Sequence, residues 1–499
     1  MDGQLLYTFL SLATGRDTPS GKAVPIEGMK LISALAHRCD IPVTWIVDSQ
    51  SAQESRDFLL RGHQECGDDV ILLVDIQRVL RESGVAAPAS KAEEIVVLRQ
   101  NLPVFITSEQ GKIREMLPWA EVNIIAADAK TDVLIEILEE LDCIGLWGYG
   151  WNGRHGDTET RGRGEEEKER YGDKETRRHG EGATQQLSPS PRPLISPSLP
   201  DGRPWSFFYA SRDHYNIPSQ SPDGLVAVES TSLDLNAAFY SGNSRVFSAE
   251  PDALRRSKLY ADKDISYPKA ILEEYIRNCP WNRFMIFLQQ QPAYQMEHAS
   301  YDDYGKGTIG ELADILGDFF HEVVYNKGIQ ALSMSEAIKL YREEFEYTEA
   351  CCMVFDGIVP LQADIEFYAP PEPKQKPPYP FTFFYYDREC QLVFEEGQMT
   401  PVQMRNYVHP PFESEYYIEK EMPSISSFHP SRDRDKLILD FEIESIKQMP
   451  FGLAIWDDHS MFSLVSTNAR LVKWIGTHLL FIRIDLEEGL NRVEVSLTI

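Results

Sequence analysis

The fold of this chain is decided by residues 42–76, which read PVTWIVDSQSAQESRDFLLRGHQECGDDVILLVDI. The runs at 42–48 and 69–76 are largely β-branched or aliphatic, which is typical of short strands that are apolar on both faces. The segment around 51–61 between them has a helical pattern. A strand, a helix and a second strand of this kind predict one unit of a parallel sheet covered by helices.

The same alternation continues on both sides of this unit. Further strands are predicted at 5–12, 122–128, 143–149, 225–230, 283–291 and 329–334, and helices at 26–38, 131–141, 268–278, 308–325 and onward to about 346. Two capping boxes, Thr308 with Glu311 and Ser333 with Glu336, mark helix starts. Seven or eight such units over about 290 residues favour a closed or nearly closed barrel. We therefore predict the α/β class, with a (β/α)7-like barrel.

The periodicity changes to two beyond residue 350. Leu437, Leu439, Phe441 and Ile443 alternate with polar residues, and a similar alternation runs through 493–499. Short strands of this kind, separated by Pro- and Gly-rich turns, predict a C-terminal antiparallel β-sandwich over 350–499. We expect the barrel and the sandwich to be separable near residue 350.

Residues 152–203 differ in composition from the rest of the chain. They are rich in Gly, Arg, Glu, Ser and Pro, with ten basic and ten acidic residues, and GDTETR at 156–161 returns as GDKETR at 172–177. Such a segment cannot bury an apolar face, so we predict a disordered insert between the two parts of the barrel, 1–151 and 204–349. Replacing it with a short Gly/Ser link is expected to leave the melting temperature nearly unchanged. A fall of more than about 5 °C would show that it packs.

Charge and composition exclude several classes of protein. The chain has 499 residues, with 49 Lys and Arg against 78 Asp and Glu, and a formal net charge of −29, which argues against nucleic acid as a partner. It has no apolar run of about 18 residues and no signal-peptide pattern at its start, so we expect a cytoplasmic protein without a membrane partner. The seven cysteines are scattered without a CxxC pair, which disfavours a disulfide framework and a cysteine-ligated zinc.

Chemistry in a parallel barrel lies at the C-terminal ends of the strands, so we collect polar residues that follow each predicted strand, together with His63 and Asp69 just before the third. Arg212, Asp213 and His214 share one loop, and Glu229 ends an apolar strand, where an acid is costly unless it is paired or used. Collected in this way, the candidate residues are Asp17, Asp48, His63, Asp69, Trp147, Trp151, Arg212, Asp213, His214, Glu229, Asp234, Glu297 and His298.

Some of these residues have an ordinary structural explanation as well. Asp68 and Asp69 precede a strand, where they would form a turn or a cap. His63 in its Gly-bounded turn would be a packed or solvated histidine. Trp147 and Trp151 would either be core residues or line the barrel mouth and stack on sugar rings.

Four segments together resemble the polysaccharide deacetylase (NodB-homology) superfamily. MKLISALAHRCDIPVTWIVD followed by GHQECGDDV resembles the opening of that family, YASRDHYNIP its Arg/Pro motif, and LVAVESTSLDLN its Asp-containing strand. MEHAS, followed by a helix and a short strand, resembles its closing pattern. The resemblance covers roughly residues 1–346 and implies a (β/α)7 barrel.

Carried over residue by residue, the resemblance implies a divalent metal such as zinc that activates a water against an acetamide carbonyl. Asp17 would match the strand-one aspartate, and His298 the late histidine that serves as general acid. His63 matches the first histidine of the turn, and the metal-binding position falls on Asp68 or Asp69. The candidate metal ligands are thus Asp69 and His298.

Three functions of different classes follow. The first is a hydrolase that acts on a carbohydrate, at acetamide bonds or at glycosidic bonds, with Glu229 as nucleophile and Asp234 or Asp69 as acid in the glycosidic case. In either case His63, Trp147, Trp151, Arg212, His214 and Glu297 would bind substrate. The second is a non-catalytic glycan-binding protein. The third is a structural or interaction protein with a degenerate barrel site.

Overall fold

The structure is a computed structural model. It describes residues 5–15, 24–82, 91–127, 132–148, 207–210, 218–219, 224–228, 231–235, 247–257, 264–297, 309–356, 381–389, 392–396, 407–409, 423–433, 435–456, 463–475 and 479–498. The predicted insert at 152–203 lies outside these residues.

A nine-stranded, largely parallel sheet forms the first part of the chain. Eight of its strands run in the order β6, β7, β5, β4, β3, β2, β1, β8, and β9 also pairs with β1. Of the strand pairs described in this sheet, β6 with β7 is the antiparallel one. The strands are β1 (Leu5–Leu12), β2 (Val43–Val47), β3 (Asp69–Val74), β4 (Ile124–Ala127), β5 (Gly145–Gly148), β6 (Phe207–Tyr209), β7 (Val226–Val228), β8 (Met285–Gln290) and β9 (Gln330–Ala331).

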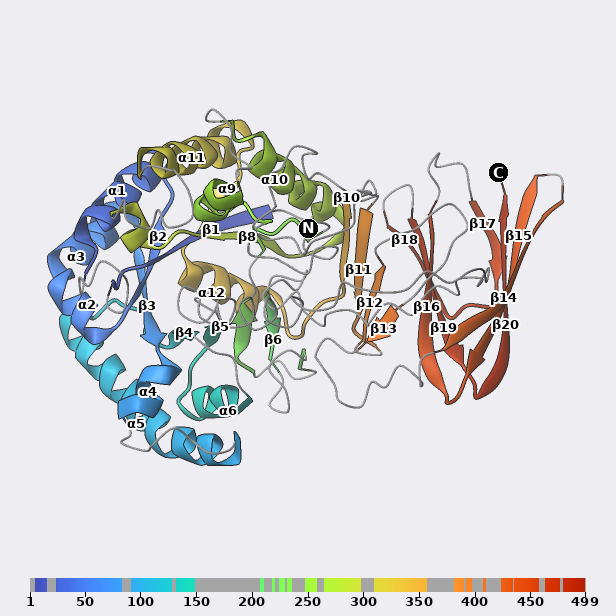
Figure 1. Ribbon diagram of the computed structural model, residues 1–499, viewed down its shortest axis with the longest axis horizontal. Coiled ribbons are helices and arrows are strands. Elements are labelled where there is room, and N and C mark those ends of the chain that lie inside the picture. The colour runs from blue at the N-terminus through green and yellow to red at the C-terminus, as the bar shows by residue number, and fades with distance from the viewer. Residues whose placement is uncertain are drawn as a thin grey trace, which may run out of the picture.

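Helices cover both faces of this sheet. Figure 1 shows most of them in an arc outside the sheet, with α12 on the inner side. Their bounds are α1 (Ile26–His37), α2 (Ser49–Glu54), α3 (Arg56–Cys66), α4 (Ile76–Glu82), α5 (Lys91–Met116), α6 (Asp132–Glu140), α9 (Pro251–Ser257), α10 (Ser266–Asn278), α11 (Ile309–His321) and α12 (Met334–Glu344). The α/β class and the parallel sheet of buried strands are confirmed.

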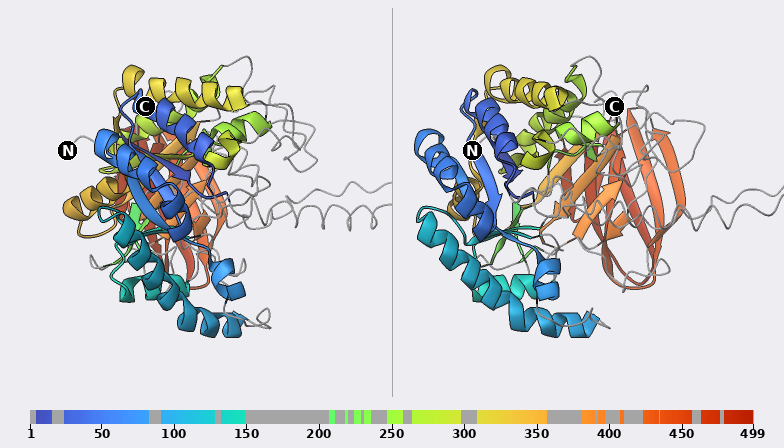
Figure 2. Two further views of the ribbon diagram at one scale, coloured as in Figure 1. Left: turned by 90° about the vertical axis from the view of Figure 1, so that its left-hand side faces the viewer. Right: turned by 60° about the vertical axis from the view of Figure 1, so that its left-hand side comes forward.

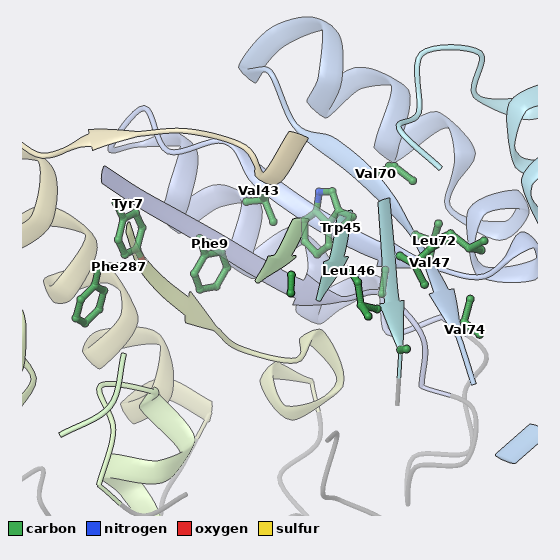
Figure 3. Close-up of a cluster of buried hydrophobic side chains, with 14 of the residues drawn as sticks. Tyr7, Phe9, Val43, Trp45, Val47, Val70, Leu72, Val74, Leu146 and Phe287 are labelled. Carbon is green, nitrogen blue, oxygen red and sulfur yellow. The ribbon is translucent and has the colours of Figure 1, made fainter. Parts of the chain in front are cut away.

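Alternate residues of each strand enter two different cores. Tyr7 and Phe9 of β1 pack with the outer helices, where Tyr7 stacks on Phe287 at 6.3 Å (Figure 3). Leu6 and Leu10 face the inner core, to which α12 contributes Met334 and other apolar residues. Burial on both sides explains why these strands carry no polar alternation.

A side chain bridges the two ends of the sheet, which brings it close to a closed barrel. Thr231 follows β7, and its hydroxyl donates to the carbonyl of Ile286 and accepts from the backbone N–H of Leu288 at 2.8 Å. Both partners belong to β8, at the other end of the strand order. The chain therefore forms a nearly closed barrel-like sheet, in which a threonine replaces part of a strand pairing.

The structure tests one of the two predicted capping boxes and the predicted strand between them. The capping box of Ser333 and Glu336 is confirmed, since each side chain bonds the other's backbone at the start of α12. Thr308 lies outside the described residues. The predicted strand at 329–334 contains only the two-residue β9, because Ser333 already caps the next helix.

The C-terminal part contains antiparallel sheets, as predicted. The described strands form three of them rather than the two of a simple sandwich, in the orders β10-β11-β12-β13, β16-β19-β18 and β14-β15-β20-β17. Figures 1 and 2 show these strands beside the parallel sheet. Their bounds are β10 (Cys351–Asp356), β11 (Phe381–Asp387), β12 (Leu392–Glu396), β13 (Tyr407–His409), β14 (Ser424–Asp433), β15 (Lys436–Ser445), β16 (Met449–Trp456), β17 (Ser463–Thr467), β18 (Leu471–Ile475), β19 (Leu479–Leu486) and β20 (Gly489–Thr498).

Strand β10 belongs to both parts of the chain. Cys351, Met353 and Phe355 pack into the outer core of the barrel, whereas Cys352 and Val354 pack into the core of the antiparallel sheets. The boundary predicted near residue 350 falls directly before this shared strand. Separability at that point stays a prediction.

Two asparagines hold the backbone of β10 against the barrel. Asn278 donates to the carbonyl of Val354 and accepts from its N–H, both at 2.8 Å. Asn282 forms the same pair of bonds with Cys352, at 2.7 and 2.9 Å. Each side-chain amide thus takes the place of a neighbouring strand.

Candidate functional site

A row of glutamines ends β8 at the C-terminal edge of the parallel sheet. Gln289 accepts a hydrogen bond from the hydroxyl of Tyr7 at 2.5 Å and donates to the carbonyl of Ala249. Gln291 is joined to β1 through its backbone, since its N–H donates to the carbonyl of Leu10 and its carbonyl accepts from Ser11. The register of β1 and β8 therefore fixes where these amides lie.

Gln290 binds one carboxylate at the start of α9 directly, and Gln291 reaches a second one through Gln295. The side chain of Gln290 donates to Glu250 at 2.7 Å. Gln291 donates to the carbonyl oxygen of Gln295 at 2.7 Å, and Gln295 donates to Asp252 at 3.2 Å. These five residues, Gln290, Gln291, Gln295, Glu250 and Asp252, are called the amide–carboxylate cluster below.

Among the described residues, several buried side-chain oxygens at this edge lack a hydrogen-bond partner. They include the side-chain carbonyl oxygen of Gln291 and the hydroxyl of Ser232, and both residues are 0% exposed. The carbonyl of Ser232 accepts from the N–H of Ala249, which connects the loop after β7 to the segment that carries Glu250. A buried polar group without a partner is costly, and it calls for a specific explanation.

A second polar group lies where β2 and β3 end. Asp48 follows β2 and accepts from the N–H of Ser51 at 2.7 Å, so it caps α2. Its other oxygen lies 3.5 Å from Arg78, which belongs to α4, the helix after β3. Glu109 of α5 accepts from the backbone and the hydroxyl of Ser49, which ties the same helix start to the outer layer.

Two of the predicted substrate-binding residues do not line this edge: His63 lies away from it, and Trp147 lies in the core. His63 lies on α3, stacks on Trp119 at 3.8 Å and contacts the carbonyl of Asp68 at 2.9 Å. Trp147 is 1% exposed within the inner core. The packed histidine and the core tryptophan were the structural alternatives for these two residues.

Asp69 is the first residue of β3 and thus lies at the N-terminal edge of the sheet. Its carboxylate accepts from the N–H and the hydroxyl of Ser335 and from the N–H of Val70. Burial raises the pKa of this carboxyl, and the hydrogen bonds offset part of that rise. Strand direction separates Asp69 from the candidates that follow strands, although all of them were grouped at one barrel mouth in the prediction from sequence.

The neighbouring Asp68 is fully buried and joins three elements. It accepts from His37 at 2.7 Å, from the indole of Trp45 at 2.9 Å and from the N–H of Val43 at 3.0 Å. With these contacts both of its oxygens are occupied. Neither aspartate offers a free oxygen to a metal, so the contacts of this pair do not fit the metal position implied by the deacetylase resemblance.

Asp234 and Glu297 lie in segments that follow strands. Asp234 comes after β7, is fully buried and accepts from the hydroxyl of Tyr267 at 2.8 Å. Burial and the nearby Asp234 carboxylate raise the pKa of Tyr267 well above its usual value. Glu297 directly follows the short helical turn Ala293–Met296, which comes after β8.

The remaining predicted site residues are outside the described part of the chain: Asp17, Trp151, Arg212, Asp213, His214, Glu229 and His298. Whether they converge on the C-terminal edge stays a prediction. Within the described residues, no group of three or more His, Cys, Asp or Glu side chains is placed to hold a metal ion.

The amide–carboxylate cluster was not selected from the sequence. Its signal was present as three consecutive glutamines, 289–291, at the end of the apolar run RFMIFL. Consecutive amides at the end of a buried strand are unusual, since each needs hydrogen-bond partners there. The carboxylates of Glu250 and Asp252 carried no comparable signal, because they follow no predicted strand.

Comparisons with known proteins give little beyond these observations. No family model matches the chain, and no curated protein matches it. Among solved structures, 4-alpha-glucanotransferase from Thermococcus litoralis aligns over 100% of both chains with 6% identity and a TM-score of 0.32. A TM-score of this size is too low to relate the folds, so nothing below depends on it. In the described part of the chain, no helix is both long and apolar enough to cross a membrane.

Proposed function

We propose that this chain is a carbohydrate-active protein that binds a glycan at the C-terminal edge of its parallel sheet and hydrolyses it. The observation that carries the proposal is the amide–carboxylate cluster at the end of β8. Reactive and binding groups of parallel barrels lie at this edge. Amides and carboxylates placed there supply the oriented polar groups with which a pocket hydrogen-bonds a ligand such as a sugar.

Hydrolysis of a glycosidic bond is the reaction we favour. It requires two carboxyl groups beside the scissile bond. Glu229 as nucleophile and Asp234 as acid remain the candidate pair, since both follow β7. Hydrolysis of an acetamide, as in the deacetylases that the sequence resembles, requires a metal in place of one of them, and the contacts of Asp69 disfavour that alternative.

Glycan binding without catalysis is the second candidate. Glu250 and Asp252 each accept a hydrogen bond from a glutamine amide N–H, at 2.7 and 3.2 Å. A carboxylate held in this way can also accept hydrogen bonds from sugar hydroxyls. These two residues are therefore suited to binding a sugar.

The test incubates the full chain with plain and N-acetylated oligosaccharides and analyses the products by mass spectrometry. Shorter oligosaccharide products support hydrolysis of glycosidic bonds, and release of acetate supports hydrolysis of acetamide bonds. Binding without any product supports glycan binding without catalysis. Glu229→Gln and Asp234→Asn are expected to abolish cleavage, whereas Asp440→Asn on β15 is the matched control. Neither binding nor turnover with any oligosaccharide would refute the proposal.

A further inference from the structure

The carboxylate of Asp252 determines which side-chain atoms donate and which accept along the glutamines of the amide–carboxylate cluster. An ionised carboxylate only accepts hydrogen bonds, so Gln295 must direct its NH2 group at Asp252. Its carbonyl oxygen then points back and must receive a donor, which is the NH2 group of Gln291 at 2.7 Å. The amide orientation of both residues, which is ambiguous for an isolated glutamine, is thereby determined.

The free end of this chain of amides is an acceptor. Because Gln291 uses its NH2 group on Gln295, its carbonyl oxygen is left over, and that oxygen is buried without a partner. Another buried oxygen without a partner at this edge, the Ser232 hydroxyl oxygen, can also accept. The backbone of Ser232 is joined to Ala249, whose carbonyl accepts from Gln289, two residues before Gln291.

We infer that the group missing from this edge is a hydrogen-bond donor, and that the ligand is a neutral, hydroxyl-rich sugar rather than an acidic one. This inference rests on the proposed function and specifies its substrate class. A uronic acid or sulfated sugar would place acceptor oxygens against the Gln291 carbonyl oxygen, which also only accepts. A sugar hydroxyl would instead donate to Gln291 and satisfy the unpaired oxygen.

Asp252 sets the orientation of the Gln295 and Gln291 amides, so the preference for a neutral sugar depends on this carboxylate. If that carboxylate is replaced by an amide, Gln295 and Gln291 are free to turn over together. The NH2 group of Gln291 can then face the ligand, and an acidic sugar is no longer disfavoured. A purely structural role for Asp252 would change stability without changing which sugars bind.

The experiment measures binding of the full chain to three hexasaccharides by calorimetry: maltohexaose, the N-acetylglucosamine hexamer and the galacturonate hexamer. We expect at least one neutral hexamer to bind and galacturonate to bind at least about tenfold more weakly, a difference of about 1.4 kcal/mol. Gln291→Met is expected to weaken neutral binding about threefold to tenfold, the size of one neutral hydrogen bond. Gln110→Met, which replaces another buried glutamine on α5, is the matched control.

A second variant keeps the inference testable if Gln291→Met fails to fold. Asp252→Asn is expected to reduce the ratio of the dissociation constants for the galacturonate and neutral hexamers. Asp440→Asn is its control and is expected to leave that ratio unchanged. Equal or tighter binding of galacturonate by the unmodified chain would overturn the inference but leave the proposed function standing. Unchanged neutral binding by Gln291→Met would also overturn it, since a buried water would then explain the unpaired oxygen. Binding of none of the three hexamers would overturn both proposals.

Discussion

Replacement of Asn278 by alanine tests how strongly the two parts of the chain are coupled. The side chain is fully buried; it forms two bonds to Val354 at 2.8 Å, and its NH2 group also donates to the carbonyl of Glu274 at 2.8 Å. Alanine would leave the N–H and the carbonyl of Val354 inside the protein without partners. At roughly 1–3 kcal/mol for each unsatisfied group, reduced by relaxation, we expect a loss of about 2–4 kcal/mol.

Urea unfolding of the full chain, followed by far-UV circular dichroism, measures this loss. The control is Asn101→Ala on α5, where the asparagine bonds only the carbonyl of Val97 in its own helix. That variant is expected to lose less than about 1 kcal/mol. The reasoning is refuted if Asn278→Ala unfolds at the same urea concentration as Asn101→Ala, because water would then replace the lost bonds at no cost.

Three further outcomes follow from the contacts described. A chain ending at residue 349 is expected to aggregate, contrary to the separability predicted from sequence, because it lacks the face of β10 that completes the barrel core; a soluble, helical product in size-exclusion chromatography would contradict this. Arg483→Ala should cost about 3–5 kcal/mol by leaving Asp387 buried without its cation, and Arg483→Met with Asp387→Leu should recover most of it in urea unfolding. Burial raises the pKa of Glu109, but hydrogen bonds from Lys112 and Ser49 outweigh it and lower the pKa below its model-peptide value of 4.5. The stability that the native chain gains over Glu109→Gln should therefore be present above pH 4.5 and shrink as the pH falls through the lowered pKa; an advantage in thermal melts that is independent of pH would exclude this linkage.

The parallel sheet could be predicted from sequence because burial on both faces leaves a local pattern. The runs at 42–48 and 69–76 contain β2 and β3 to within a residue or two. The alternation of Leu439, Phe441 and Ile443 likewise predicted which side of β15 is buried. In both cases the side chains that decide the structure are neighbours in the chain.

The candidate site was predicted less well, since site residues meet only after the strands are ordered. Asp69 was grouped with residues at strand ends, but it begins its strand and is bound by Ser335, 266 residues further along. Gln291 and Asp252 were not selected, although one glutamine joins them. The start of β3 at residue 69 was predicted correctly, but the local sequence does not show which strand ends meet at one edge or that a partner lies 266 residues away.

The amino-acid sequence by itself determined the class of fold, the change of period near residue 350 and the excess of negative charge. The tertiary structure decided which polar groups are satisfied, which face of β10 serves which core, and that Thr231 bridges β7 and β8. The physical reason is range: periodicity records the burial of each residue along one element, whereas hydrogen-bond partners at the sheet edge come from segments brought together by strand order. The orientation of Gln291 depends on a carboxylate in another element, and no pattern local to the glutamines contains that information.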